Sequence, residues 1–200
     1  MSAGVTSERV YGALKSSLLS GHILPGERLE PRSYAEALQT SATPVRDALH
    51  RLVGEYLVEM RPAEGFLVPA MTDSGLRSLY TWHLDLSLLI VRRWPGDLRP
   101  KMPDLTGTDY ADRARRLFTT MAVYSGDIEL VRQAAAASDR LATARVAEAR
   151  ILADADRDLR GLATLINAAD TNKIAHWLEH YHQNRINLIG QIIRASISIF

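Results

Sequence analysis

The chain has no cysteine among its 200 residues, so it holds neither a disulfide framework nor a thiolate metal site. It also lacks an apolar run approaching the roughly 18 residues of a membrane-spanning helix. Its N-terminus lacks the basic and then apolar pattern of a secretion signal. Together these absences favour a protein of the cytoplasm with no membrane association.

Excess charge of either sign is missing as well, since the formal net charge at pH 7 is +1. Residues 1–75 hold seven Lys and Arg against nine Asp and Glu. Any affinity for nucleic acid must therefore come from a local basic cluster and not from the total charge. The arginines that would have to gather on one face are Arg28, Arg32, Arg46, Arg51 and Arg61.

The segment of residues 40–49 has the features of a helix presented by its N-terminus. Ser41 and Thr43 are favoured residue types at a helix start, and Pro44 is tolerated in a first turn. Hydroxyl groups and Arg46 at that end suit DNA phosphates and guanine edges. An apolar stripe formed by Val45, Ala48, Leu49 and Leu52 would equally suit an ordinary amphipathic helix.

The patterns along the chain predict a mainly α protein with two domains, residues 1–70 and 71–200. In the first we expect helices near 7–20, after 31–33 and over 43–54, followed by a β-hairpin of residues 57–61 and 65–68. From Asp73 onward only helical patterns occur. The helices expected there cover residues 73–94, 109–124, 128 to about 149, 155–167 and 172 to about 196.

From Arg9 to Val68 the chain resembles the winged helix-turn-helix of the GntR family of bacterial transcription regulators. The matching blocks occur in the family's order: Val10 to Leu19, Leu24-Pro25-Gly26, Tyr34 to Leu38, Thr43 to Leu52, Tyr56 to Glu59, and Gly65 to Val68. The resemblance implies a homodimeric repressor, not an enzyme, that binds a pseudo-palindromic operator in double-stranded DNA.

The same resemblance assigns DNA contacts to individual positions. Arg46 matches an arginine that reads a base edge, since its fork can engage guanine O6 and N7 together. Ala42 departs from the family's usual arginine, so one expected guanine contact is missing. The full set carried over is Arg32, Ser41, Thr43, Arg46 and Gly65, with the hydroxyls on phosphates and Gly65 at the tip of the wing.

The helical part resembles the effector domain, often called FCD, of the family's fatty-acid-regulator branch. Metal-binding members hold an ion with Asp and His at positions that fall here near Ala114, Phe118, Leu159 and Tyr181. None of these is a ligand type, so we expect no metal, no cofactor and a small hydrophobic or aromatic effector, or none. The expected pocket, which could also be plain core, comprises Trp82, His83, Phe118, Met121, Leu159, Trp177 and Tyr181.

Two alternatives remain open from the sequence. His176, Glu179 and His180 match the H-x-x-E-H motif, in which a helix holds zinc between two histidines and glutamate acts as base. A zinc hydrolase would need a third ligand well downstream, and neither Asp nor Glu follows His180. The other alternative is a winged-helix protein-interaction module that no longer touches DNA.

Overall fold

The fold was analysed in a computed structural model that describes residues 3–97, 99–102, 104–106 and 109–197. The chain divides into two compact units, Met1–Met71 and Thr72–Phe200. Each unit has its own cluster of buried hydrophobic side chains. We therefore describe the two units separately.

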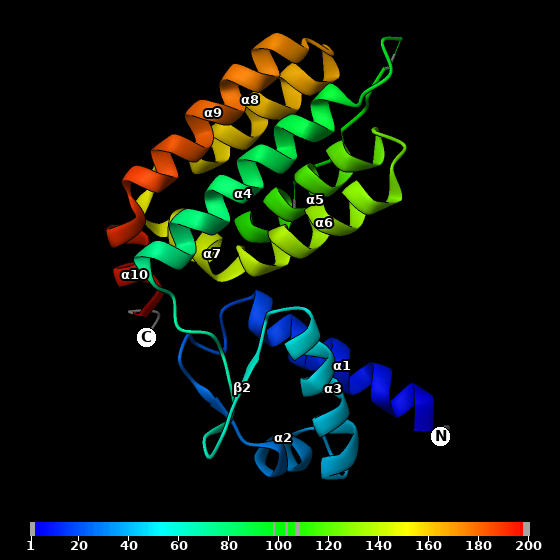
Figure 1. Ribbon diagram of the computed structural model, residues 1–200, viewed down its shortest axis with the longest axis vertical. Coiled ribbons are helices and arrows are strands. Elements are labelled where there is room, and N and C mark those ends of the chain that lie inside the picture. The colour runs from blue at the N-terminus through cyan, green and yellow to red at the C-terminus, as the bar shows by residue number, and fades with distance from the viewer. Residues whose placement is uncertain (1–2, 98, 103, 107–108, 198–200) are drawn as a thin grey trace. The chain divides into compact units, whose positions relative to one another are not determined.

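The N-terminal unit is a winged helix-turn-helix (Figure 1). Its sheet is antiparallel with the strand order β1-β3-β2, and Met60 of β2 faces Phe66 of β3 in the register. Strand β1, which the sequence did not predict, pairs Leu29 with Phe66. The elements are α1 (Ala3–Leu19), β1 (Arg28–Leu29), α2 (Pro31–Ala37), α3 (Ala42–Gly54), β2 (Glu59–Arg61) and β3 (Gly65–Leu67).

Helix α3 is held by the apolar stripe that the sequence predicts. Val45, Ala48, Leu49 and Leu52 are all buried, and they belong to one cluster with Val10 and Leu14 of α1. Proline stands in the first turn of α2, where its missing N–H is not needed. A left-handed residue, Gln39 (φ 51°), then turns the chain between α2 and α3.

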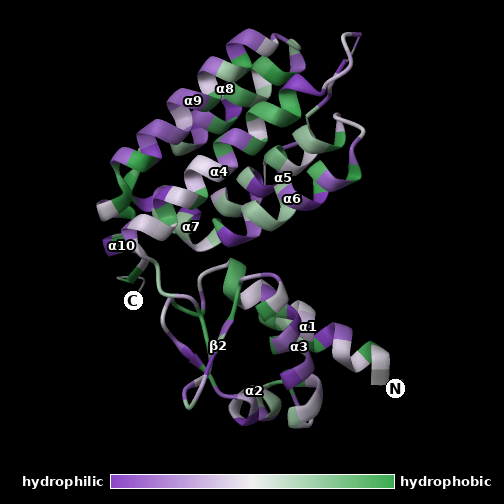
Figure 2. Cartoon of the chain, in the orientation of Figure 1, coloured by the Kyte–Doolittle hydropathy of each residue, from purple (hydrophilic) through white to green (hydrophobic). Residues whose placement is uncertain are grey.

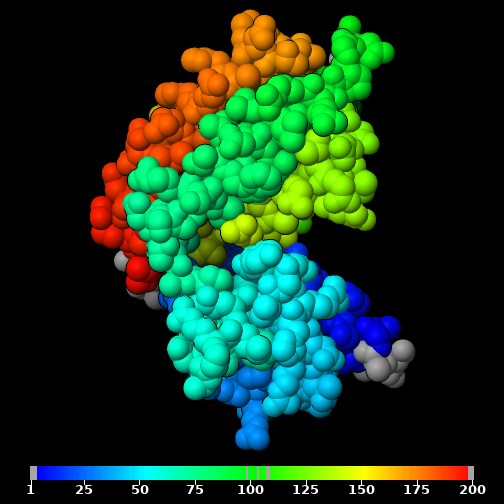
Figure 3. Space-filling model, viewed as in Figure 1, coloured from blue at the N-terminus to red at the C-terminus, as the bar shows by residue number. Residues whose placement is uncertain are grey.

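The C-terminal unit is a helical bundle, and its described residues contain no strand. Its helices are α4 (Asp73–Arg92), α5 (Tyr110–Val123), α6 (Ile128–Arg140), α7 (Ala142–Ile151), α8 (Ala155–Asn167), α9 (Thr171–Asn187) and α10 (Ile189–Ile197). Figure 3 shows α4 as a diagonal band between α9 and α6, and α4 contacts both of them. Hydrophilic and hydrophobic residues occur on each of these helices (Figure 2), as burial on one side requires.

Two expected long helices are each divided in the structure. The segment from Ile128 forms α6 and α7 with a break at Leu141, and the segment from Thr171 forms α9 and α10 with a break at Leu188. Neither break contains proline, and both break residues are leucines whose backbone lies close to the helical region. Because composition does not mark such breaks, the expectation of single helices was wrong.

Candidate DNA interface and bundle interior

The residues assigned to DNA lie mainly at the start of α3 and on α2. Thr43 and Arg46 are exposed in the first turns of α3, and Arg32 is exposed in the first turn of α2. Ser41 occupies the N-cap position of α3, but its side chain accepts no capping hydrogen bond. Its hydroxyl is therefore not engaged in the usual task of a serine at a helix start.

Intramolecular ion pairs leave few cations of the N-terminal unit available to a ligand. Four of its basic side chains contact carboxylates, and Arg9 donates to the carbonyl of Leu38 at 3.0 Å. Among the described residues, Arg32 and Arg46 have no carboxylate partner. The four pairs are Lys15–Glu55 (2.7 Å), Arg28–Glu30 (3.8 Å), Arg51–Glu8 (2.5 Å) and Arg61–Glu59 (2.6 Å).

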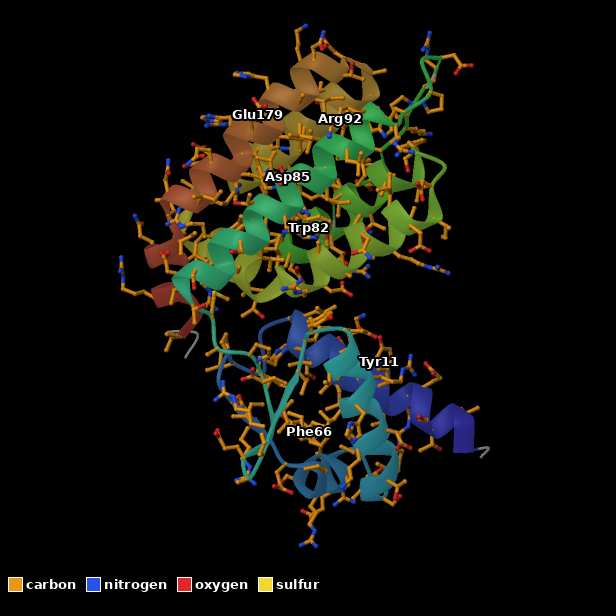
Figure 4. The ribbon with its side chains drawn as sticks, in the orientation of Figure 1. Tyr11, Phe66, Trp82, Asp85, Arg92 and Glu179 are labelled. Atoms are coloured by element: carbon orange, nitrogen blue, oxygen red, sulfur yellow. The ribbon has the colours of Figure 1, made fainter. Side chains whose placement is uncertain are left out.

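The wing carries little net positive charge of its own. Arg61 contacts Glu59 and also lies 3.7 Å from Glu64. Gly65 has φ +81° at the end of the turn, a conformation that glycine adopts without strain. Turn geometry is thus a sufficient reason for glycine at this position. Phe66, labelled in Figure 4, packs edge-to-face on His50 of α3 at 5.0 Å and so attaches the wing to α3.

A polar cluster between α1 and α3 was missed in the sequence. The Tyr11 hydroxyl donates to Glu55 at 2.6 Å, and the Arg51 guanidinium lies 3.8 Å from the centre of the Tyr11 ring. Burial, with the hydrogen bond to Glu55, raises the pKa of Tyr11. This cluster engages two basic side chains, Arg51 and Lys15, that composition would otherwise offer to DNA.

In the bundle, most side chains assigned to the effector pocket lie together inside. The rings of His83 and Phe118 are 4.4 Å apart, and those of Phe118 and Tyr181 are 5.8 Å apart. Trp177 is partly buried and stacks on Tyr181 at 4.9 Å. Trp82 is 45% exposed on α4 (Figure 4), so the structure does not place it with the others. The fully buried members are His83, Phe118, Met121, Leu159 and Tyr181.

A buried carboxylate that the sequence did not suggest connects several helices of the bundle. Glu148 of α7 accepts hydrogen bonds from Tyr80 of α4 (2.5 Å), from Tyr110 of α5 (2.8 Å) and from Arg185 of α9 (3.2 Å). Burial and the adjacent carboxylate raise the pKa of both tyrosines well above the usual value. Arg185 also contacts Asp158 at 3.0 Å. Two carboxylates, Glu148 and Asp158, therefore balance the charge of the buried Arg185 guanidinium.

Next to this cluster, two histidines and an arginine form a chain of hydrogen bonds. The Leu178 carbonyl can only accept, so the hydrogen of His182 must be on Nδ1, which lies 2.7 Å away. His182 Nε2 then accepts from His83 Nδ1 (2.7 Å), and His83 Nε2 accepts from Arg145 (3.2 Å). Both rings are neutral in this arrangement. Burial lowers the pKa of His83 well below its usual value and that of His182 to about 3.

The side chains at the expected metal positions do not include a His, Asp or Glu ligand. The resemblance placed those positions near Ala114, Phe118, Leu159 and Tyr181, and all four are buried. Both histidines of the interior use both ring nitrogens in hydrogen bonds within the protein. In the part of the chain that the structure describes, no three His, Cys, Asp or Glu side chains are grouped to hold a metal.

The H-x-x-E-H segment lies on the outside of α9. His176, Glu179 and His180 are exposed, and no third ligand joins them among the described residues. His176 and His180 border a shallow hollow of about 660 Å³ with Trp177. A second hollow of about 540 Å³ lies where α4 ends and α9 begins. Neither arrangement provides the third protein ligand that a zinc hydrolase needs.

Comparisons with known proteins agree with this picture of the N-terminal unit. Residues 6–68 match the model of the bacterial regulatory proteins of the gntR family. The transcriptional regulator McbR of Escherichia coli K12 is 36% identical over 93 residues, which are 46% of this chain and 42% of McbR. The transcriptional repressor GlaR of the same strain is 23% identical over 121 residues, 56% of this chain and 55% of GlaR. The aligned segments thus span about half of these relatives.

Solved structures extend the likeness to both units. The structure of E. coli McbR/YncC has a TM-score of 0.70 at 22% identity and covers 96% of this chain and 99% of its own. A putative GntR regulator from Rhodococcus sp. RHA1 has a TM-score of 0.73 at 16% identity, covering 92% and 96%. At these identities the fold is shared. Within the described residues, no helix combines the length and apolar character needed to cross a membrane.

Proposed function

We propose that the whole chain is a transcriptional regulator that binds a specific operator, since residues 6–68 match the gntR family of bacterial regulatory proteins and the chain is similar to the regulator McbR. The observation that carries the proposal is that two exposed arginines are left without a carboxylate partner. Arg32 and Arg46 are exposed and have no carboxylate partner among the described residues, and they lie at the starts of α2 and α3.

In this proposal the start of α3 enters the major groove. Arg46 reads a guanine through its O6 and N7 atoms, which discriminates against a wrong base by about 1–3 kcal/mol. Ser41 and Thr43 donate to phosphates, and Arg32 adds a further backbone or base contact. Gly65 lets the wing approach the minor groove. Ala42 supplies no donor, so the operator differs from that of relatives with arginine there.

The regulator is proposed to act as a homodimeric repressor in the cytoplasm. A pair of symmetric recognition helices reads half-sites whose symmetry mirrors that of the protein, so the operator is pseudo-palindromic. The name of the relative GlaR, a transcriptional repressor, supports repression as the mode of action. The bundle would respond to a small effector that favours one arrangement of the DNA-binding units by its differential affinity.

The effector is proposed to contact the aromatic interior of the bundle. Phe118, Met121 and Leu159 offer an apolar wall, and His83 and Tyr181 add polar atoms to it. Trp177 borders both Tyr181 and the hollow on α9. We leave Trp82 out of this set because it is exposed on α4.

A gel-shift experiment with DNA from upstream of the chain's own gene tests the proposed function. Wild type should give a specific band that Arg46→Ala abolishes while weak non-specific binding survives. Arg61→Ala is the matched control, since Arg61 is exposed but contacts Glu59 and Glu64, and it should keep the specific band. A wild-type protein without sequence preference at any salt concentration would refute operator binding.

A further inference from the structure

Arg145 is a buried cation whose charge the protein itself does not neutralise. It is 1% exposed, and among the described residues no carboxylate lies within ion-pair distance of it. Its Nη1 group lies 3.5 Å from the Ser138 carbonyl and its Nη2 group 3.2 Å from His83. Its Nε–H has no hydrogen-bond partner, and neither has the Ser138 hydroxyl. The buried guanidinium and the hydroxyl of the residue whose carbonyl it contacts thus each keep an unsatisfied polar group.

The neighbouring side chains cannot supply the missing negative charge. His83 and His182 are held neutral by their fixed hydrogen-bond directions, and His83 donates its only ring N–H to His182. Glu148 is already engaged by two tyrosines and Arg185. The Phe118 ring, 5.2 Å from the guanidinium, offers only the weak attraction of its face.

An arginine side chain remains charged in proteins, and a buried charge requires a counter-charge or strong hydrogen bonds. We propose that Arg145 and Ser138 form a metal-independent site for a small monovalent anion in the interior of the bundle. The inference deepens the effector part of the proposed function and rests on it.

The geometry limits what the site can take. Donors are the Arg145 Nε–H and the Ser138 hydroxyl, while His83 holds the guanidinium in place by accepting from Nη2. The surroundings of both groups are buried, so the anionic group must be small. A halide ion or the carboxylate group of a larger effector both satisfy these conditions, because each accepts hydrogen bonds from several directions.

Thermal unfolding of the full chain tests the site. The protein is titrated with sodium bromide, sodium acetate or sodium benzoate, at constant ionic strength and in the presence of EDTA. Wild type should show a saturable rise in Tm of about 2–4 °C when the anion is at roughly five times its Kd. Response to bromide alone would identify a halide site, and response to acetate or benzoate a carboxylate site; either supports the proposal.

Variants decide whether Arg145 is responsible. Arg145→Met should lose the rise, and Arg160→Met, an exposed arginine on α8, should keep it. If Arg145→Met does not fold, Arg145→Lys keeps the charge but removes the Nε–H, and its Kd for the anion should rise at least ten-fold. Ser138→Ala should weaken binding less. A rise that persists unchanged in the Arg145 variants, or no rise with any anion in wild type, would overturn the proposal.

A crystal soaked in bromide gives a direct readout. An anomalous peak within hydrogen-bond distance of Arg145 Nε and Ser138 Oγ is expected, and a water molecule there without bromide would contradict the site. Failure of this proposal is separable from failure of the proposed function. If the protein binds its operator but its Tm does not respond to any anion, only the anion site is refuted.

Discussion

At the scale of single residues, the bundle interior depends on groups that are charged or neutral for identifiable reasons. Glu148 accepts hydrogen bonds from three donors, whereas His83 and His182 are neutral because each ring both donates and accepts within the protein. Burial lowers the pKa of His182 to about 3, below the ordinary value of 6.5. In the unfolded chain both rings return to the ordinary value.

Acid should therefore destabilise the folded protein as the pH falls below 6.5, the ordinary pKa of histidine. Between pH 6.5 and about 3 the unfolded state binds a proton at His182 that the folded state does not. The free energy of unfolding should fall by about 1.4 kcal/mol per pH unit for each such histidine, on the order of 2 kcal/mol each by pH 5. Urea unfolding followed at pH 7 and pH 5 measures this fall.

Two variants identify the source of that pH dependence. His182→Gln should be less stable at pH 7 but lose less stability on acidification than wild type. His180→Gln, on the exposed face of the same helix, should keep the full dependence. Equal pH dependence in all three proteins would show that the buried histidines are not responsible.

At the scale of elements, one carboxylate holds four helices together. Glu148 of α7 accepts from α4, α5 and α9 and is fully buried. Removing the Glu148 charge would leave the buried Arg185 with Asp158 alone and would take the charged acceptor from two buried tyrosines. The bundle should therefore be far more sensitive at this position than at any exposed glutamate.

Glu148→Gln should lower the free energy of unfolding by about 3–5 kcal/mol because Arg185 and two tyrosines lose their common acceptor charge. Glu179→Gln, an exposed change of the same type on α9 (Figure 4), should alter it by less than about 0.5 kcal/mol. Urea denaturation at pH 7 compares the two. A small effect of Glu148→Gln would mean that the network is dispensable.

Helix starts give a second comparison at this scale. The Thr72 side chain accepts from the Gly75 amide at 3.2 Å at the start of α4, whereas Ser41 makes no such bond at the start of α3. Thr72→Ala should cost about 1 kcal/mol of stability, and Ser41→Ala less than about 0.5 kcal/mol. Ser41→Ala should instead weaken DNA binding in an anisotropy titration, equally for all sequences. A stability loss at Ser41 equal to that at Thr72 would contradict a free hydroxyl.

The elements also show what a sequence can predict. The apolar stripe of α3 and the alternation of the hairpin are periodic signals, and both appear in the structure at nearly the expected residues. Strand β1 has two residues and gives no periodic signal. Nothing in the sequence singled out Arg145, Glu148 or Arg185, because their partners are distant in the chain. Tertiary packing brings Arg185 to Glu148 and Tyr110 across 37 and 75 residues, and Arg145 to His83 across 62 residues.

At the scale of the whole molecule, each unit has a core of its own. A separate fragment of residues 72–200 should therefore unfold cooperatively and keep its helical circular dichroism. A fragment of residues 1–71 should also fold, with a Tm much lower than that of the longer fragment. The short fragment should bind DNA more weakly than the full chain, because we expect residues 71–200 to carry the contacts of the proposed dimer. A long fragment without a cooperative transition would show that its core is not self-sufficient.

Selection from a random pool of double-stranded DNA tests the central claim most directly. The full chain should enrich a two-fold symmetric motif with a guanine at a fixed place in each half-site. Arg46→Ala should lose the preference for that guanine, and Arg61→Ala should enrich the same motif as wild type. Enrichment of no motif by the wild-type protein, or of an unchanged motif by Arg46→Ala, would contradict the account.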